Sequence, residues 1–202
     1  MPTQANHSAI GDWIVAHAPQ GGRVLDIGCG EGDLLARLVA ERGMRPDGIE
    51  LSEAEVMTAI KRGLSVHHGD VEEGLDHYPD GNFDLVILSL TIQELGDPLK
   101  VIHEAFRVGR RVVIVLPNFG HWRARWQLAV LGRAPSTPTL PYTWYKSPNR
   151  HYLTLADWEE LCEQEKWRVV AKGFLAGGNR AAILPNLMAE VGMYLLELPG
   201  KR

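Results

Sequence analysis

The feature that most constrains this chain is a glycine-rich turn that directly follows a short apolar strand. Residues 24–32 read Val-Leu-Asp-Ile-Gly-Cys-Gly-Glu-Gly. Glycine accepts backbone conformations that other residues avoid, and it lets a ligand lie directly on the main chain. A strand that runs into such a turn and then into a helix is the first unit of a nucleotide-binding α/β sheet.

Strand and helix patterns alternate along the first half, which predicts a mostly parallel sheet with helices on both faces. Strands are expected at 23–27, up to Glu50, and at 64–68, 83–88 and 112–116. Helices are expected around 10–17, after the glycine loop as far as Gly43, after Ser52 with Glu55 completing a capping box, and from Asp97-Pro98 with Leu99, Ile102 and Phe106 on its apolar face.

The second half begins with a segment in which the alternating strand and helix pattern breaks off. Residues 117–150 look like an insertion, helical around 122–131 and irregular afterwards. A helix capped by Thr154 and Asp157, a strand at 167–171 and a seventh strand at 180–184 are expected next. The last apolar residues, from Leu187 to Leu198, have helical spacing. We therefore predict a single seven-stranded domain, residues 1–202, with an insertion at about 117–150.

Composition narrows the range of partners and compartments. The 21 Lys and Arg residues against 25 Asp and Glu residues give a net charge of −4, which offers no basic field for nucleic acid or an anionic membrane. The two cysteines are too few for a disulfide framework and suit a reducing compartment. No signal peptide and no long apolar run stand out. We expect a soluble, cytoplasmic protein.

The spacing of the glycines separates two classes of nucleotide-binding loop. The dinucleotide fingerprint G-x-G-x-x-G would place its third glycine at position 33, where this chain has Asp33. Glu31 and Asp33 stand where a helix N-terminus would otherwise attract pyrophosphate, and carboxylates there repel phosphate. S-adenosylmethionine (SAM) carries a sulfonium and an ammonium group and no phosphate. We expect SAM or S-adenosylhomocysteine, and this spacing disfavours an NAD-dependent reductase.

Two further acids follow the next two strands. Glu50 ends the second strand, at about the position where an acid binds ribose hydroxyls in related sheets. Asp70 follows the third strand and could accept a hydrogen bond from an adenine amino group. Singly, each acid is more simply a helix cap or a solvent-facing residue, but together at one sheet edge they favour a cofactor site. The predicted cofactor-binding residues are Asp26, Gly28, Cys29, Gly30, Gly32, Glu50, Leu51, Asp70, Val71 and Ser89.

These residues resemble class I SAM-dependent methyltransferases as far as about Leu116. The whole chain resembles a narrower family, the methionine biosynthesis protein MetW family. The motifs that carry the resemblance are R-V-L-D-I-G-C-G-E-G (23–32), F-D-L-V-I-L-S (83–89), L-P-N-F-G-H-W-R (116–123), L-P-Y-T-W-Y (140–145) and P-N-R-H (148–151). The resemblance departs at Asn6-His7-Ser8, where an Arg-x-Asp pair would be expected.

The resemblance implies a Rossmann-like methyltransferase fold and an accessory role in methionine biosynthesis, supporting or regulating homoserine O-acyltransferase (acetyltransferase). It does not by itself imply methyl transfer. The segment after the fourth strand, Ser89-Leu90-Thr91-Ile92-Gln93-Glu94, lacks the Asn/Asp-Pro-Pro-aromatic motif of many amino-group methyltransferases. A SAM-dependent methyltransferase acting on a small-molecule acceptor remains the alternative. Catalytic residues are not assigned.

Other reactive side chains have simpler interpretations. His67, His68, His121 and His151 are candidate general bases, although structural hydrogen bonding is the simpler role for each. A metal site at His67, His68 and Asp70 is not expected, because adjacent strand residues point to opposite faces. Cys29 fits a small packing residue better than a nucleophile, since no histidine adjoins it in the sequence.

The insertion concentrates aromatic and basic residues. Stacking on single-stranded nucleic acid is one use for such a cluster, but the net negative charge argues against it. Tryptophan and arginine also anchor protein interfaces. An acyltransferase-docking surface and plain internal packing both remain open, and part of the insertion is expected to cover the SAM pocket. The proposed docking residues are Trp122, Arg123, Arg125, Trp126, Trp144 and Tyr145.

Overall fold

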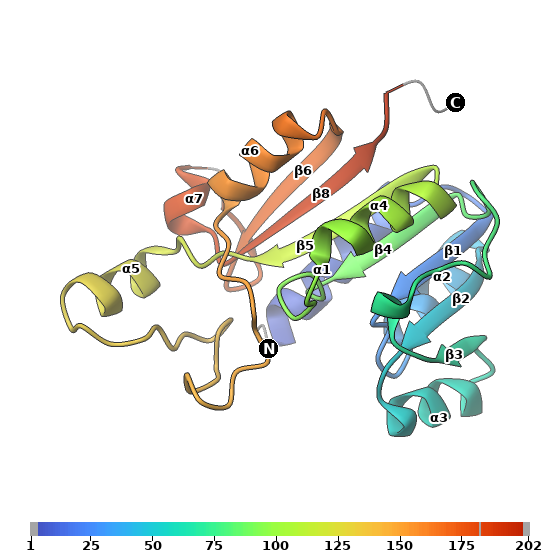
Figure 1. Ribbon diagram of the computed structural model, residues 1–202, viewed down its shortest axis with the longest axis horizontal. Coiled ribbons are helices and arrows are strands. Elements are labelled where there is room, and N and C mark those ends of the chain that lie inside the picture. Colours follow the sequence, from blue (N-terminus) through green and yellow to red (C-terminus); the bar gives the residue numbers. More distant parts are fainter. Residues whose placement is uncertain (1–3, 182, 200–202) are drawn as a thin grey trace.

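The computed structural model describes residues 4–181 and 183–199, which build one central sheet with helices on both faces (Figure 1). The strands are β1 (Arg23–Ile27), β2 (Arg45–Glu50), β3 (Val66–His68), β4 (Leu85–Ser89), β5 (Arg111–Pro117), β6 (Arg168–Ala176), β7 (Asn179–Arg180) and β8 (Val191–Glu197). The helices are α1 (Gln4–His17), α2 (Asp33–Arg42), α3 (Glu53–Lys61), α4 (Pro98–Val108), α5 (Trp122–Ala129), α6 (Leu155–Gln164) and α7 (Pro185–Met188), with a 3-10 turn η1 (Val71–Glu73).

The strand order is β3-β2-β1-β4-β5-β8-β6-β7. The strands β1 to β5 pair in parallel, whereas β8 runs antiparallel to both β5 and β6. This is the predicted Rossmann-like α/β fold with a mostly parallel sheet. The described residues form eight strands rather than the predicted seven, because residues Val191–Glu197 form the strand β8 and not a helix.

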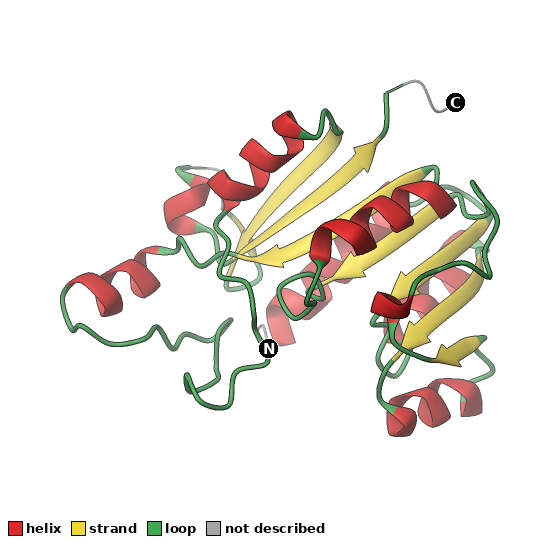
Figure 2. Cartoon of the chain, viewed as in Figure 1, coloured by secondary structure: helices red, strands yellow, loops and turns green. Residues whose placement is uncertain are grey.

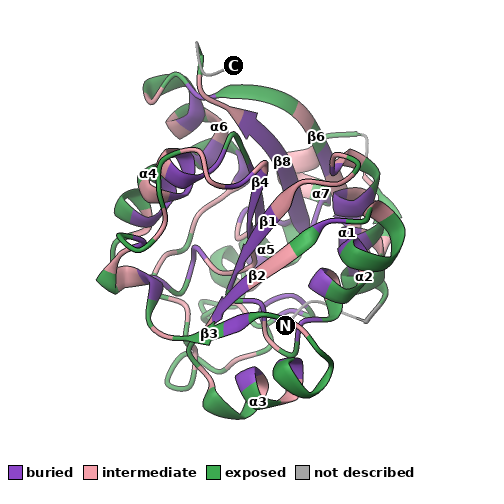
Figure 3. Cartoon of the chain, turned by 90° about the vertical axis from the view of Figure 1, so that its right-hand side faces the viewer, coloured by how far each residue is buried: buried purple, intermediate pink, exposed green. Residues whose placement is uncertain are grey.

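The central strands are apolar throughout because both faces of the sheet are covered. On one face, alternate residues such as Val86 and Leu88 pack in a cluster with α4 and α6. On the other face, Leu85 and Ile87 pack with residues of α1, α2 and α3. Figure 3 shows the buried strands running through the middle of the molecule between these two helical layers.

Several predicted helix ends are confirmed. Gly43 ends α2 in the left-handed conformation, as a glycine C-cap should. The Asp97 side chain accepts a hydrogen bond from the backbone N–H of Lys100 at the start of α4. Thr154 and Asp157 form a complete capping box at the start of α6.

Three local predictions are wrong. Ser52 is the N-cap of α3, but its side chain makes no capping hydrogen bond, so the predicted box with Glu55 does not form. Leu99 is exposed, whereas Ile102 and Phe106 are buried as expected. The strand expected at 180–184 shortens to β7, and Ala182 lies outside the described residues.

The helix predicted from the spacing of apolar residues near the C-terminal end is also wrong. Residues Val191–Glu197 form the strand β8, which lies between β5 and β6. Every residue from Val191 to Leu196 is buried, because a strand inside a covered sheet is buried on both faces. A short run that is apolar on all sides fits a buried strand as well as a helix segment, and periodicity alone cannot separate them.

The insertion leaves the sheet at the carboxyl end of β5. The helix α5 extends beyond that edge, and the chain from there to α6 is mostly loop (Figure 2). We call residues 118–151 the arm. No helix within the described ranges combines the length and apolarity that crossing a membrane requires.

Asn118 fixes the start of the arm. Its side chain is buried, and its Nδ2 donates to the carbonyl oxygens of Asn186 and Ala189 at 3.1 and 2.8 Å. Its Oδ1 accepts from the backbone N–H groups of Gly120 and Leu155 at 2.9 and 3.4 Å. One amide therefore ties together the arm, the start of α6 and the segment before β8.

Asn6 fixes the N-terminal helix in a comparable way. It is completely buried, and its Nδ2 donates to Glu190 Oε2 at 3.0 Å. The turn after β6 completes the network, since Gly178 N donates to Asn6 Oδ1 and Gly177 N donates to Glu190 Oε2. Asn6 thus places α1 against the C-terminal strands.

Replacing Asn118 by alanine is expected to lower the free energy of unfolding by about 2 kcal/mol or more, because buried backbone groups lose their partners. Asn179→Ala is the matched control, since Asn179 is exposed and should stay within about 0.5 kcal/mol of wild type. Urea unfolding of both variants measures the difference. Equal stability of the two variants would contradict the role given to Asn118.

Candidate functional site

The glycine loop is held against the neighbouring strand by its own backbone. The N–H groups of Gly28 and Cys29 both donate to the carbonyl oxygen of Ile49, at 2.8 and 3.2 Å. Gly28 has φ +74°, and a Cβ there would lie 2.9 Å from Thr91 Oγ1. The loop conformation therefore depends on glycine, as the sequence predicted.

The Glu50 side chain also fixes the glycine loop, at Gly30. Its Oε2 accepts from the backbone N–H of Gly30 and its Oε1 accepts from that of Ser52, both at 2.9 Å. The end of β2 is thereby joined to the glycine loop and to the start of α3. This bond to Ser52 N also takes the donor that a capping box would have used.

Asp26 lies beneath this loop with its carboxyl group buried. Its Oδ1 has no hydrogen-bond partner among the described residues. Burial, with a smaller contribution from the Glu50 carboxylate, raises the pKa of Asp26 from 3.8 to about 7. A buried carboxyl oxygen without a partner marks a place where a ligand donor or cation would lower the free energy.

Glu55 is a site residue that the sequence analysis missed, because it was read as half of a capping box. Its carboxylate approaches the glycine loop, with Oε2 3.6 Å from the Cβ position that Gly30 lacks. Burial, followed by Glu50 and Glu31, raises its pKa. Apart from residues 29–31 themselves, no other described residue comes within 4 Å of that position, so a ligand can approach the backbone at Gly30.

Glu31 and Asp33 are not the free carboxylates that the sequence suggested. Both carboxylates form ion pairs with Arg62, which lies just beyond α3. Their charge is therefore largely offset. The negative charge at the loop comes instead from Glu50 and Glu55, joined by Asp26 once the pH exceeds its raised pKa of about 7, and the preference for a cationic ligand still follows.

The remaining predicted residues lie at the same carboxyl edge of the sheet. Asp70 is exposed and its side chain accepts from the backbone N–H of Glu72, so it caps η1. Leu51 is an exposed apolar residue next to Glu50, Val71 is buried in the core, and Ser89 ends β4 half-buried. The structure thus gathers these residues at the strand ends.

Cys29 is a buried packing residue. A Cβ on Gly48 would lie 2.6 Å from its Sγ, so the thiol fills the space beside the β2 backbone. Burial and the nearby carboxylates of Asp26 and Glu50 raise the pKa of Cys29 to about 12. A thiol held in its protonated form is a poor nucleophile.

The histidines are divided among separate structural roles. His68 Nε2 bonds to the carbonyl oxygen of Leu51 at 3.0 Å, whereas the His67 ring packs edge-on against Tyr78. His121 is buried, and burial lowers its pKa. It caps α5 by accepting from Arg123 N. Among the described residues, no group of three His, Cys, Asp or Glu side chains could hold a metal ion.

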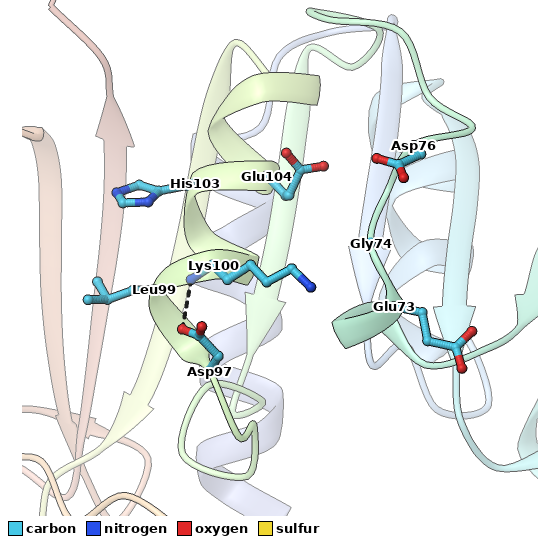
Figure 4. A pocket seen from close by; sticks show the side chains of 8 residues that line it. All are labelled: Glu73, Gly74, Asp76, Asp97, Leu99, Lys100, His103 and Glu104. Atoms are coloured by element: carbon cyan, nitrogen blue, oxygen red, sulfur yellow. Dashed lines mark hydrogen bonds between the residues drawn. The ribbon is translucent and has the colours of Figure 1, made fainter.

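A pocket of about 650 Å³ lies beside the sheet, between α4 and the segment after β3 (Figure 4). Its lining is charged, with Glu73 and Asp76 facing Lys100 and Glu104 across the opening. None of the predicted cofactor residues lines it. The glycine loop and its carboxylates are therefore separate from this pocket.

The arm presents its aromatic side chains to solvent. Trp122, Trp126, Trp144 and Tyr145 are 43%, 51%, 77% and 65% exposed, which rules out plain packing in the described core. Arg123 stacks over the Trp122 ring at 5.3 Å. Arg125 instead donates to the carbonyl oxygens of Gly120 and Asn186, so it braces the arm itself.

The arm covers less of the site than expected. Figure 1 shows α5 well away from β1, β2 and β3. Contact with the post-β4 loop comes from the arm's end, where the N–H groups of Arg150 and His151 donate to the carbonyl oxygen of Gln93. The Arg150 side chain also pairs with Glu72, next to Asp70, at 3.8 Å.

Comparison with known proteins decides the family. A family model described as methionine biosynthesis protein MetW matches residues 5–196. The chain belongs to the MetW family. A curated relative, the bifunctional methionine biosynthesis protein MetXA/MetW of Rhodopirellula baltica, is 34% identical over 174 residues, which cover 81% of this chain and 28% of the relative.

Two further comparisons show that the MetW chain is similar to methyltransferases over part of its sequence and in its fold. The ubiquinone biosynthesis O-methyltransferase of Ralstonia nicotianae is 33% identical over 97 residues, covering 45% of this chain and 40% of that protein. This chain therefore spans less than half the length of either curated relative. A solved SAM-dependent methyltransferase from Thermotoga maritima matches with a TM-score of 0.66 at 19% identity, covering 98% of this chain and 91% of that one. At that identity the likeness shows the fold.

The raised pKa of Asp26 predicts how stability depends on pH. Between the unfolded value of 3.8 and the folded value of about 7, the folded protein holds a proton that the unfolded chain has lost. The free energy of unfolding should therefore fall as pH rises from about 4 to about 7. Denaturant unfolding at pH 5, 6, 7 and 8 measures this slope.

Asp26→Asn supplies the control, since it keeps the shape and cannot ionise. The variant should lose this part of the slope and be at least as stable as wild type at pH 8. Parallel pH profiles for the two proteins would show that Asp26 titrates normally.

Proposed function

We propose that this MetW-family protein is a SAM-binding accessory subunit that supports or regulates homoserine O-acyltransferase. The observation that carries the proposal is the combination of a methyltransferase fold with an exposed aromatic arm in a chain whose curated relative joins MetXA and MetW in one polypeptide. Fusion of two proteins in one organism favours their association where they are separate. The partner is inferred from that relative's name.

The cofactor half of the proposal rests on the glycine loop. Gly30 leaves its backbone open, and Asp26, Glu50 and Glu55 supply negative charge around it. These groups fit the sulfonium and ammonium of SAM. Glu50 would hold the ribose hydroxyls, and the exposed Leu51 would pack against the adenine. Asp70 and Val71 after β3, together with Ser89 at the end of β4, would complete the cofactor pocket.

The partner half rests on the arm. Large exposed aromatic rings beside arginine are typical of interface anchors, and a protein surface rarely leaves several of them together without use. Trp126, Trp144 and Tyr145 with the Arg123–Trp122 stack form the proposed docking surface. Arg125 belongs to its support. SAM would regulate the complex if it binds the free and complexed states with different affinity.

A methyltransferase acting on a small acceptor is the second candidate. The similarity to a ubiquinone biosynthesis O-methyltransferase favours it. A structural role for the segment after β4 disfavours this second candidate. The Gln93 carbonyl in that segment accepts two hydrogen bonds from the end of the arm. Incubation with labelled SAM and cell extract, followed by a search for methylated product, separates the two candidates.

Calorimetry should detect SAM or S-adenosylhomocysteine binding to the wild-type protein. Glu50→Ala is expected to weaken it by about 1.5–3 kcal/mol, the range for hydrogen bonds to a charged group. Glu53→Ala, an exposed acid in the first turn of α3, serves as the control and should bind like wild type. If neither compound gives a heat of binding at millimolar concentration, the cofactor proposal is contradicted.

Pull-down of homoserine O-acyltransferase tests the docking surface. Trp126→Ala and Arg123→Ala should each weaken the complex by about 2 kcal/mol, or about thirtyfold. Met57→Ala on α3 and Arg110→Ala beyond α4 remove exposed side chains elsewhere and should have no effect. Equal binding by all four variants would show that the arm is not the interface.

The same experiment with and without SAM tests regulation, with acyltransferase activity as a second readout. A SAM-dependent change in either quantity supports the coupling. If neither binding nor activity changes with SAM, the regulatory part of the proposal is contradicted and the accessory role alone remains.

A further inference from the structure

The arm carries charge of one sign. Residues 118–151 hold five Lys and Arg residues and no Asp or Glu. The remainder of the chain, which we call the body, holds the other 16 Lys and Arg residues and all 25 Asp and Glu residues, a net charge of −9. The small net charge of the whole chain is therefore made of two opposite parts, a basic arm that extends beyond the carboxyl end of β5 and an acidic body (Figure 1).

Most cations of the arm have no carboxylate paired with them. In the body, Arg37, Arg62 and Arg111 each form ion pairs with acidic side chains. Within the described ranges the arm contributes one such pair, between Arg150 and Glu72 at 3.8 Å. The arm cations for which the described residues provide no ion pair are Arg123, Arg125, Arg133 and Lys146. All four are exposed, so the arm presents uncompensated positive charge to solvent.

Hydrogen bonds fix the turn that carries Arg133. The Gln127 side chain on α5 donates to the Ser136 carbonyl at 2.8 Å and accepts from the Ser136 N–H at 2.7 Å. The Arg133 N–H donates to the Gln127 carbonyl at 3.2 Å. The chain therefore folds back on α5, and the backbone of Arg133 lies in a closed turn beside the helix that carries Trp126.

A second turn carries Lys146. Its N–H donates to the Thr143 carbonyl at 2.9 Å, and the two residues between them are the exposed Trp144 and Tyr145. A surface that is already ordered loses less conformational entropy when a partner binds. The arm therefore presents positive charge and aromatic area together, on turns that are formed before any partner arrives.

The aromatic rings of the arm suit a protein partner better than nucleic-acid bases or a lipid surface. Base stacking uses free ring faces, whereas the Arg123 guanidinium covers Trp122, and Trp144 and Tyr145 pack edge to face at 5.5 Å. A helix that lies in a lipid surface needs a broad apolar face. The helix α5 is eight residues long and has two arginines between its two tryptophans, so it lacks such a face.

Carboxylates are the protein groups that match this surface. A guanidinium binds a carboxylate through two parallel hydrogen bonds, and a guanidinium stacked on a ring, as Arg123 is on Trp122, still has its N–H edge free for them. The acidic body repels the same carboxylates. A partner with an acidic face is therefore attracted to the arm and turned away from the rest of the chain.

We propose that the face of the acyltransferase that docks on the arm is acidic, with carboxylates opposite Arg123, Arg133 and Lys146 around an apolar patch that receives the exposed rings. The inference rests on the proposed function, because it specifies the partner surface for that docking. Opposite charges on the two faces speed the encounter and fix its orientation, while the aromatic contacts hold the complex once it has formed.

Association and dissociation rates of the full-length chain with homoserine O-acyltransferase, measured by biolayer interferometry, test the charge of the partner face. Raising the NaCl concentration from about 0.05 M to about 0.5 M shortens the range of interactions between exposed charges. The association rate should fall about tenfold or more. The dissociation rate should change less, because the aromatic contacts do not depend on salt.

The double variant Arg133→Glu/Lys146→Glu reverses two arm charges and leaves the exposed rings in place. It should associate about tenfold more slowly than wild type at low salt and lose most of the salt dependence. The matched control is Arg45→Glu/Lys61→Glu, which changes the net charge by the same amount at two exposed positions of the body. The control should associate like wild type, and thermal unfolding checks that both variants are folded.

The outcomes separate this inference from the docking itself. Binding with an association rate that does not change with salt, or equal rates for the arm and body variants, would overturn the acidic face and leave the docking standing. No binding of wild type at low salt would overturn both. Single-stranded RNA and phosphatidylglycerol vesicles, tested in parallel, should not bind. Binding of either that the arm variant abolishes would assign the arm to phosphate groups and overturn the inference.

Discussion

The pairing of β8 with β5 is the constraint on which the rest of the structure depends. The two strands pair in antiparallel register from Arg111 opposite Glu197 to Pro117 opposite Val191. The residue after Pro117 continues the contact, because Asn118 N donates to the Glu190 carbonyl. The same short segment before β8 therefore ends the sheet, anchors the arm and, through the Glu190 side chain, holds α1.

The proposed cofactor site and the proposed docking surface lie at two parts of one edge. The glycine loop is set by β1 and β2, whereas the arm leaves from β5. Their physical link is the end of the arm, where Arg150 contacts Gln93 and Glu72. A ligand at the strand ends would therefore reach the arm through Arg150.

Much of the framework was predictable because its causes are local. The strands β1 and β5 end close to where their apolar runs end, and the caps at Asp97 and Thr154 are decided within four residues. The gathering of the cofactor residues at the carboxyl edge follows from parallel pairing, so it too was foreseeable. The exposure of the arm was not, since an aromatic cluster fits a core and an interface equally well in sequence.

The sequence by itself determined the glycine loop, the alternation of strands and helices and the acids that follow β2 and β3, because each is encoded by residues next to one another. The tertiary structure decided the rest. It made β8 a strand, since an apolar run takes its conformation from the strands on either side. It also turned Glu55 toward Gly30 instead of its own helix end, because the Glu50 carboxylate, from a neighbouring strand, had already taken the N–H of Ser52.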